Sequence, residues 1–308
     1  MSPLRQALAD YLRMRRALGY KLERAGKLLP QFVDYLEQSS ADTVTVERAL
    51  AWATLPAGGS ARWWAFRLSM ARGFAAYLHS LDPAHQVPPA DLLPGRSRRA
   101  TPYLYSDAEI AALLAAAGSL RFPLRVATYR TLIGLLAVTG MRVGEAIRLD
   151  RGDLDLKHQL LVVRDSKFGK SRELPLHPST IRALRDYLRL RDRLHRSPAV
   201  PALFVSPAGT RLFYCNVHAT FRQLRRRAGL QPRSACCRPR IHDLRHTFAI
   251  RTLLDGYHDN GDVQPRLSLL ATSLGHVHPD STYWYLSAAP ELLALAGQRL
   301  ERHLGNQR

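Results

Sequence analysis

HDLRHTFA at residues 242–249 and LGHVHPDSTYWY at residues 274–285 bring several reactive side chains together in the last third of the chain. His242 and Arg245 are three residues apart, so they share one face if the segment is helical. Tyr285 follows His276 by nine residues. A histidine and an arginine at this spacing are common on protein surfaces, so the significance of the two stretches depends on residues elsewhere.

A second arginine upstream could complete a phosphate-binding pair. In TGMRVGEAIRL (139–149), Arg142 follows a Thr-Gly turn at the start of a predicted short helix, and a helix N-terminus favours an anion. Arg142 and Arg245 could therefore clamp the non-bridging oxygens of one phosphate. Two guanidiniums can neutralise the charge that a metal often neutralises in phosphoryl transfer, so the sequence predicts no metal and no cofactor.

The remaining groups fit the other tasks of breaking a phosphodiester. The stretch SKFGKSRELPL places Lys167 at the tip of a predicted β-hairpin, where it could protonate a leaving 5′-oxygen. His242 and His276 could orient the phosphate and manage the proton of the nucleophile. Tyr285 could attack the phosphorus and hold it as a covalent ester, which conserves the bond energy for rejoining.

The charge of the chain indicates a polyanionic partner. The 308 residues include 45 Lys plus Arg against 25 Asp plus Glu, a formal net charge of +20. Such an excess repels itself in a compact protein, and nucleic acid is the simplest partner that compensates it. The candidate DNA-contacting arginines are Arg62, Arg67, Arg96, Arg98, Arg99, Arg225 and Arg226.

Composition also indicates a class and a compartment. Hydrophobic residues make up 46% of the chain, as in globular proteins. The three cysteines form no CxxC pair, which favours a reduced, cytosolic protein over a disulfide scaffold or a zinc site. No apolar run approaches the roughly 20 residues that span a bilayer, so no membrane contact is expected.

Hydrophobic periodicity and proline content predict two domains joined by a linker. Residues 1–82 carry apolar positions at helical spacing and predict an all-α domain, with Thr45 capping its third helix. The aromatic residues of its fourth helix, about 60–80, are expected in the core. Residues 83–102 hold five prolines and an RSRR run, which predicts a basic, extended linker lying against DNA. Residues 103–308 form the second domain.

The second domain is predicted to be mainly α with a small β-hairpin or sheet, an α+β arrangement. It opens with a capping-box pattern from Ser106 to Glu109. Strands are expected at 160–163 and 172–176, which form the hairpin, and at 203–205. Helices are expected at about 124–138, 142–149, 179–196, 216–228 and 290–304, with an inserted loop at 257–263.

In order and in most of their spacing, these stretches resemble the tyrosine recombinases, the integrase family of phages and mobile elements. The match runs from residue 139 to residue 285. It implies a site-specific recombinase that cleaves and rejoins DNA through a 3′-phosphotyrosyl intermediate. The implied roles are phosphate binding for Arg142 and Arg245, general acid for Lys167, base-like histidine for His242, second histidine for His276, nucleophile for Tyr285, and support of the first arginine for Glu145.

The resemblance also implies partners. The substrate would be double-stranded DNA with a specific recombination site, and the N-terminal domain resembles the core-type DNA-binding domain of the family. A C-terminal helix at about 290–308 would dock on a neighbouring protomer and link a homo-tetramer on DNA. The enzyme would act in the bacterial cytoplasm on the nucleoid. The sequence leaves open whether accessory proteins or sister recombinases take part.

Several features depart from the family pattern or leave alternatives open. Tyr283 and Lys170 compete with Tyr285 and Lys167, although the nine-residue offset from the preceding histidine favours Tyr285. The stretch 256–273 is longer than usual. The run from residue 281 resembles recombinases of bacterial transposable elements, which implies integration or excision of a mobile element; the sequence leaves inversion and resolution open. The alternatives are a type IB topoisomerase-like relaxer and a DNA-binding or architectural subunit that no longer cuts.

Overall fold

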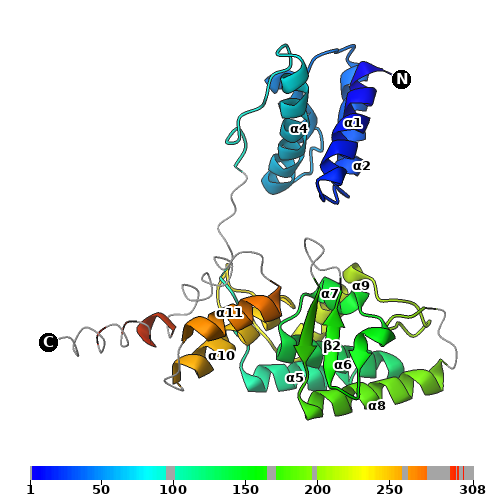
Figure 1. The fold of residues 1–308 in the computed structure, drawn as a ribbon, viewed down its shortest axis with the longest axis vertical. Coiled ribbons are helices and arrows are strands. Elements are labelled where there is room, and N and C mark those ends of the chain that lie inside the picture. Colours follow the sequence, from blue (N-terminus) through cyan, green and yellow to red (C-terminus); the bar gives the residue numbers. More distant parts are fainter. Residues whose placement is uncertain are drawn as a thin grey trace. The chain divides into compact units, whose positions relative to one another are not determined.

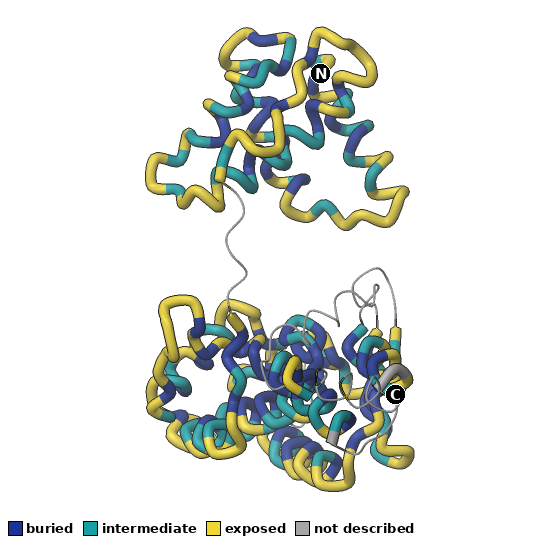
Figure 2. The backbone as a smooth tube through the Cα atoms, turned by 90° about the vertical axis from the view of Figure 1, so that its left-hand side faces the viewer, coloured by how far each residue is buried: buried dark blue, intermediate teal, exposed yellow. Residues whose placement is uncertain are grey.

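The computed structural model describes residues 2–94, 101–164, 171–195, 200–258, 263–275, 292–295, 297 and 301. Backbone contacts divide the chain into two units, Met1–Arg99 and Ala100–Arg308. Each unit has a buried core of its own, seen as the dark blue stretches inside each part of Figure 2.

The N-terminal unit is all-helical, as predicted. It consists of α1 (Pro3–Ala17), α2 (Ala25–Gln38), α3 (Val46–Thr54) and α4 (Ala61–Leu81). The side chains of Ser2, Thr45 and Ser60 each accept a hydrogen bond from the backbone N–H three residues later, so each caps a helix and satisfies a donor that the helix leaves free. The predicted cap at Thr45 is confirmed.

The aromatic residues of α4 are not all in the core, contrary to the prediction. Phe74 is fully buried and packs against Tyr11 with ring centroids 5.6 Å apart. Trp63 is 36% exposed and stacks on Phe66, with centroids 5.8 Å apart. The reason is position along the helix, because the buried side chains of α4 begin only at Arg67.

In the C-terminal unit, α6 is the central helix. The unit begins with α5 (Asp107–Ala117), whose predicted capping box is present: Ser106 Oγ accepts from the Glu109 N–H at 3.1 Å, and Glu109 Oε2 accepts from the Ser106 N–H at 2.8 Å. Three other helices, α5, α8 (Pro178–Leu194) and α10 (Asp243–His258), pack around α6 (Pro123–Thr139). The side chains of Leu132 and Ile133 are fully buried there.

A small antiparallel sheet flanks these helices (Figure 1). After the short 3-10 helix η1 (Arg151–Asp153), β1 (Leu154–Asp155), β2 (Leu160–Val163) and β3 (Arg172–Pro175) pair in the order β1-β2-β3. The predicted hairpin is confirmed, and β1 is an addition. The strand predicted at 203–205 is wrong: its residues are buried, but Val205 makes only an isolated bridge with Arg211, and no described strand pairs with this run.

The buried side chains of α9 (Tyr214–Arg227) belong to the main core of this unit, whereas α10 and α11 (Val263–Leu274) form a separate apolar cluster. In Figure 1, α10 and α11 lie side by side. The predicted bounds of the loop at 257–263 are wrong at both ends, because α10 continues to residue 258 and α11 begins at residue 263. Helical structure is favoured there because Leu253, Leu270 and Leu274 bury their side chains together, and Leu292 joins them.

Candidate active site

The turn between α6 and α7 (Val143–Arg148) presents Arg142. Gly140 ends α6 with φ +60°, a left-handed conformation that favours glycine. A Cβ at this position would also collide with the ring of Phe248. The resulting tight turn places Arg142 at the N-cap of α7, with its side chain 30% exposed. Arg142 thus lies at a helix N-terminus, where an anion is favoured.

Glu145 holds Arg142 from the inside of the protein. Its side chain is 2% exposed and accepts hydrogen bonds from Nη1 of Arg142 at 2.7 Å and from the backbone N–H of Arg142 at 2.9 Å. Burial alone would raise the pKa of Glu145, but hydrogen bonds from Arg172 and Arg142 outweigh it and lower the pKa to about 2. Glu145 is therefore an ionised carboxylate that fixes Arg142.

Arg245, in the first turn of α10, is held by backbone carbonyls. The residue is 3% exposed. Its Nη1 donates to the carbonyl oxygen of Gly140 at 2.9 Å, and its Nη2 donates to that of Leu274 at 2.8 Å. These bonds tie the guanidinium to the end of α6 and the end of α11. A cation fixed in this way needs little reorganisation when it meets an anion.

We expected His242 and Arg245 to share a face if their segment were helical. His242 lies just before α10, so the two residues do not share a helical face. A turn joins them, in which the backbone N–H of Arg245 donates to the carbonyl oxygen of His242 at 3.1 Å. Although His242 is exposed as a residue, surrounding atoms desolvate its ring, and the positive charges of Arg245 and Arg142 add to this effect. Together they lower the pKa of His242 to about 4. The imidazole is neutral at neutral pH and can accept a proton.

The sequence did not single out Asp243, which anchors the start of α10. Asp243 is fully buried and accepts hydrogen bonds from the backbone N–H, Nε and Nη2 of Arg240 at 2.9, 3.0 and 2.7 Å. It fixes the helical turn that carries Arg245. The available signal was an acid in the first turn of a helix, where the helix dipole favours negative charge.

The sequence also did not single out Arg172, at the start of β3. Its side chain is 6% exposed. Its Nη2 donates to Oε2 of Glu145 at 2.8 Å, and its Nε donates to the carbonyl oxygen of Ser273 at 2.6 Å. Arg172 therefore links the acid that fixes Arg142 to the end of α11. The available signal was an arginine directly after the hairpin tip.

Four predicted site residues converge where the turn before α7, the start of α10 and the end of α11 meet: Arg142, Glu145, His242 and Arg245. The other catalytic candidates and their rivals lie outside the described residues: Lys167, Lys170, His276, Tyr283 and Tyr285. The last described residue before His276 is Gly275, whose carbonyl oxygen accepts from Nη2 of Arg142 at 3.5 Å. Gly275 is therefore the last described residue of the site along the chain.

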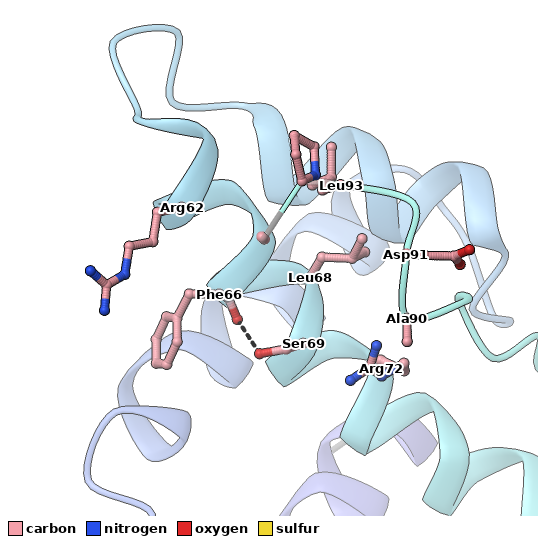
Figure 3. Close-up of a pocket in the computed structure, with 10 residues that line it drawn as sticks. Arg62, Phe66, Leu68, Ser69, Arg72, Ala90, Asp91 and Leu93 are labelled. Atoms are coloured by element: carbon pink, nitrogen blue, oxygen red, sulfur yellow. Dashed lines mark hydrogen bonds between the residues drawn. The ribbon is translucent and has the colours of Figure 1, made fainter. Parts of the chain in front are cut away.

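Of the arginines in the N-terminal unit that were predicted to contact DNA, Arg62 is accessible and Arg67 is not. Arg62 is exposed and borders a surface hollow of about 790 Å³, with Arg72 and Phe66 also lining it (Figure 3). Arg67 is instead 6% exposed: its Nη2 donates to the Trp52 carbonyl oxygen at 2.7 Å, and its guanidinium carbon lies 3.9 Å from the centre of the Trp52 ring. A guanidinium buried on an indole cannot reach a phosphate.

The other predicted DNA contacts differ in exposure. On α9, Arg226 is exposed, whereas Arg225 is half-buried and donates from Nη1 to the carbonyl oxygen of Pro239 at 3.4 Å. Arg226 is therefore the better placed of the two for a phosphate. The three linker arginines lie outside the described residues: Arg96, Arg98 and Arg99.

The described part of the chain offers neither a metal-binding cluster nor a membrane-spanning helix. Within it, no group of three or more His, Cys, Asp or Glu side chains is placed to hold a metal ion. None of its helices combines the length and apolar character needed to cross a membrane.

Comparison with known proteins identifies the family. Residues 105–291 match the model of the phage integrase family. The chain is 45% identical over 308 residues to the putative integrase/recombinase y4rB of Sinorhizobium fredii, covering 98% of both chains. It is 32% identical over 243 residues to the tyrosine recombinase XerC of Alcanivorax borkumensis, covering 78% of this chain and 76% of that one. The chain belongs to the phage integrase family.

Solved structures agree on the fold. The Tn1549 transposon integrase in complex with transposon right end DNA matches with a TM-score of 0.65 at 18% identity, covering 96% of this chain and 98% of that one. XerA recombinase matches with a TM-score of 0.52 at 24% identity, covering 96% and 98%. The mainly α fold with a small antiparallel sheet is that of tyrosine recombinases, and the protein is a site-specific recombinase of this type.

Proposed function

We propose that the protein cleaves and rejoins double-stranded DNA at a specific site through a covalent 3′-phosphotyrosyl intermediate. The observation that carries the proposal is the fixed arginine pair. Arg142 is held by buried Glu145, and Arg245 is held by two backbone carbonyls, beside the neutral imidazole of His242. Preorganised positive groups stabilise the charge on a phosphate in the transition state of phosphoryl transfer.

The remaining roles complete a balanced exchange of bonds. The phenolic oxygen of Tyr285 attacks the phosphorus, and the bond to the 5′-oxygen breaks. The leaving oxygen takes a proton from Lys167, and the phenol proton passes to His242, while His276 donates a hydrogen bond to the phosphate. Attack by the 5′-hydroxyl of a second strand reverses these steps and restores the tyrosine. Because one ester replaces another, rejoining needs no added energy source.

The biological setting that we propose is integration and excision of a mobile element, by a protein acting on the nucleoid in the bacterial cytoplasm. The relative y4rB is named a putative integrase/recombinase, and the Tn1549 integrase was solved in complex with transposon right end DNA. The net charge of +20 supports a DNA partner. These observations favour a mobile element over a purely architectural DNA-binding role.

Assembly as a tetramer on DNA, with or without accessory proteins or sister recombinases, belongs to the same proposal. The segment expected to link protomers, about 290–308, lies mostly outside the described residues. Leu292 is fully buried in its own unit, whereas Leu293 is 54% exposed. We therefore propose that the outward side chains of this segment, such as Leu293, contact a neighbouring protomer.

A covalent-adduct experiment tests the cleavage proposal. Duplexes that bind the protein tightly are selected from a random-sequence library. They are then remade with a nick beside each phosphate in turn, so that a cleaved end diffuses away and the adduct persists. We expect a protein–DNA adduct on denaturing gels for the wild type and for Tyr283→Phe. We expect none for Tyr285→Phe, whose DNA binding persists.

Results that differ from this expectation would each support a different alternative. An adduct that survives in Tyr285→Phe but is lost in Tyr283→Phe overturns the choice of nucleophile. No adduct on any tightly bound duplex favours a silent, architectural subunit. An adduct together with relaxation of supercoiled plasmid, but without strand exchange between two sites, favours a topoisomerase-like relaxer.

A further inference from the structure

The C-terminal end of α11 binds three arginines that come from three different elements. The carbonyl oxygens of residues 273, 274 and 275 accept, in that order, from Arg172 Nε at 2.6 Å, Arg245 Nη2 at 2.8 Å and Arg142 Nη2 at 3.5 Å. The last carbonyls of a helix have no partner within the helix and carry partial negative charge, so guanidinium groups suit them. The end of α11 is therefore a common support for the arginines of the site.

Arg172 binds the same buried carboxylate as Arg142, but its own side chain is less exposed. Its Nη2 donates to Oε2 of Glu145 at 2.8 Å, and the same carboxylate accepts from Nη1 of Arg142 at 2.7 Å. The Arg172 side chain is only 6% exposed, against 30% for Arg142. Arg172 directs Nε to the carbonyl oxygen of Ser273 and both Nη groups to Glu145, so its contacts connect Glu145 to the end of α11.

Gly275 packs directly against Arg172. It has φ +66°, a left-handed conformation that favours glycine. A Cβ on Gly275 would lie 2.8 Å from Nη1 and 3.2 Å from Cζ of Arg172. The guanidinium therefore occupies the space that any side chain at this position would need, and the two residues constrain each other.

We propose that Arg172 is a positioning residue of the recombinase: it joins Glu145 to the end of α11, and so aligns Arg142 and Arg245 on one phosphate. This inference rests on the proposed cleavage function. Arg172 acts through its neighbours and does not contact the DNA. Gly275 is required beside it because only glycine leaves room for the guanidinium.

Charge balance gives the physical reason for this role. Two guanidiniums share one buried carboxylate, so the group retains one positive charge for a phosphate. Without Arg172, Glu145 would be left with Arg142 as its remaining arginine partner and would neutralise it more fully. The end of α11 would also lose its bond to Nε, and the carbonyls that hold Arg142 and Arg245 could shift. A displacement of about 1 Å in a positioning group can cost about 100-fold in rate.

The test compares Arg172→Met and Arg172→Lys with a matched control, Arg151→Met. Arg151 also forms an ion pair, with Asp192 at 2.6 Å, but its side chain is 53% exposed. On the duplex that gives the wild-type adduct, we measure the single-turnover cleavage rate with protein in excess, the affinity for DNA, and the thermal unfolding midpoint. Cleavage rate and DNA affinity are measured separately because a variant that only unfolds more readily would lose both, in proportion to the folded protein that remains.

We expect Arg172→Met to slow cleavage by about 100-fold while its DNA affinity stays within a few-fold of wild type. Arg172→Lys should recover part of the rate, since lysine restores the charge but not the two-sided contact. Arg151→Met should match the wild type. Equal cleavage rates for Arg172→Met and wild type overturn the inference, and so does a rate loss accounted for by loss of folded protein. Absence of any wild-type adduct is a failure of the proposed function instead.

A double-mutant cycle keeps the inference testable if Arg172→Met folds poorly. Gly275→Ala should slow cleavage in the wild-type background because its Cβ displaces the guanidinium. In the Arg172→Lys background, whose narrower ammonium leaves room, the same substitution should slow cleavage less. Equal effects in the two backgrounds mean that Gly275 does not act through Arg172, and they overturn the proposed pairing.

Discussion

At the residue scale, the protonation state of His242 is the first property to measure. Desolvation of its ring and the charges of Arg245 and Arg142 lower its pKa to about 4, below the ordinary 6.5. We predict that NMR titration of the free protein, with the signal assigned by His242→Gln, shows an imidazole neutral down to about pH 5. Bound DNA should raise this pKa, because a phosphate offsets the two arginine charges. A pKa of His242 at or above 6.5 in the free protein would contradict the conclusion that burial and the two arginines disfavour its protonated form.

Glu145 makes stability depend on pH in a lower window. Its pKa is about 2 in the folded protein, against 4.5 for the free group. A lowered folded pKa gives stability that is present above pH 4.5 and is lost as the pH falls towards 2, and this shift corresponds to about 3 kcal/mol. We predict that Glu145→Gln lowers the free energy of unfolding by about this amount at pH 7. Denaturant titrations should also show that the free energy of unfolding falls less steeply below pH 4.5 in the variant than in the wild type.

How much of the site could be predicted depended on the range of its contacts. Arg142 and Arg245 could be predicted because local spacing placed them in short motifs. Arg172 could not, because its partner Ser273 lies 101 residues away, and one sequence does not reveal a contact of that range. The prediction that Arg67 contacts DNA was wrong for a related reason. Arginine among aromatic residues is typical of a DNA-facing helix, but the face that packs on Trp52 is decided by tertiary structure.

At the element scale, substitution by alanine should have opposite effects at Gly134, inside α6, and at Gly140, the residue that ends it. Gly140 has φ +60° and no room for a Cβ beside Phe248, so Gly140→Ala should lower the free energy of unfolding by about 3 kcal/mol. Gly134 lies inside α6 with open space around its Cβ direction, so Gly134→Ala should raise it by about 1 kcal/mol. Thermal or denaturant unfolding of both variants checks this. Similar effects of the two substitutions would show that the end of α6 does not define the turn.

Elements with strong local signals were predicted well, and those defined by partners were not. The Ser106 capping box and the hairpin from β2 to β3 follow from residue types at fixed offsets. The buried run 203–205 resembles a strand by composition, but a strand also needs a neighbour, which sequence patterns do not supply. The continuation of α10 and the start of α11 likewise depend on apolar packing with Leu292, a contact between distant segments.

At the scale of the whole molecule, the C-terminal segment combines packing within the chain with the proposed contact between protomers. Leu292 is fully buried among side chains of α10 and α11, so Leu292→Ala should lower the free energy of unfolding by about 3 kcal/mol. Leu293 is 54% exposed, so Leu293→Ser should change it by less than about 0.5 kcal/mol. These two neighbouring substitutions separate stability from assembly.

If outward side chains of this segment dock on a neighbouring protomer, Leu293→Ser should weaken the multimer on DNA without weakening the binding of a single copy. Deletion of residues 290–308 should also abolish assembly, but it removes Leu292 and so destabilises the C-terminal unit as well. Sedimentation of protein on duplexes with one site and with paired sites measures both steps. A Leu293→Ser variant that binds one site and assembles on paired sites like the wild type would place the contact between protomers elsewhere on the molecule.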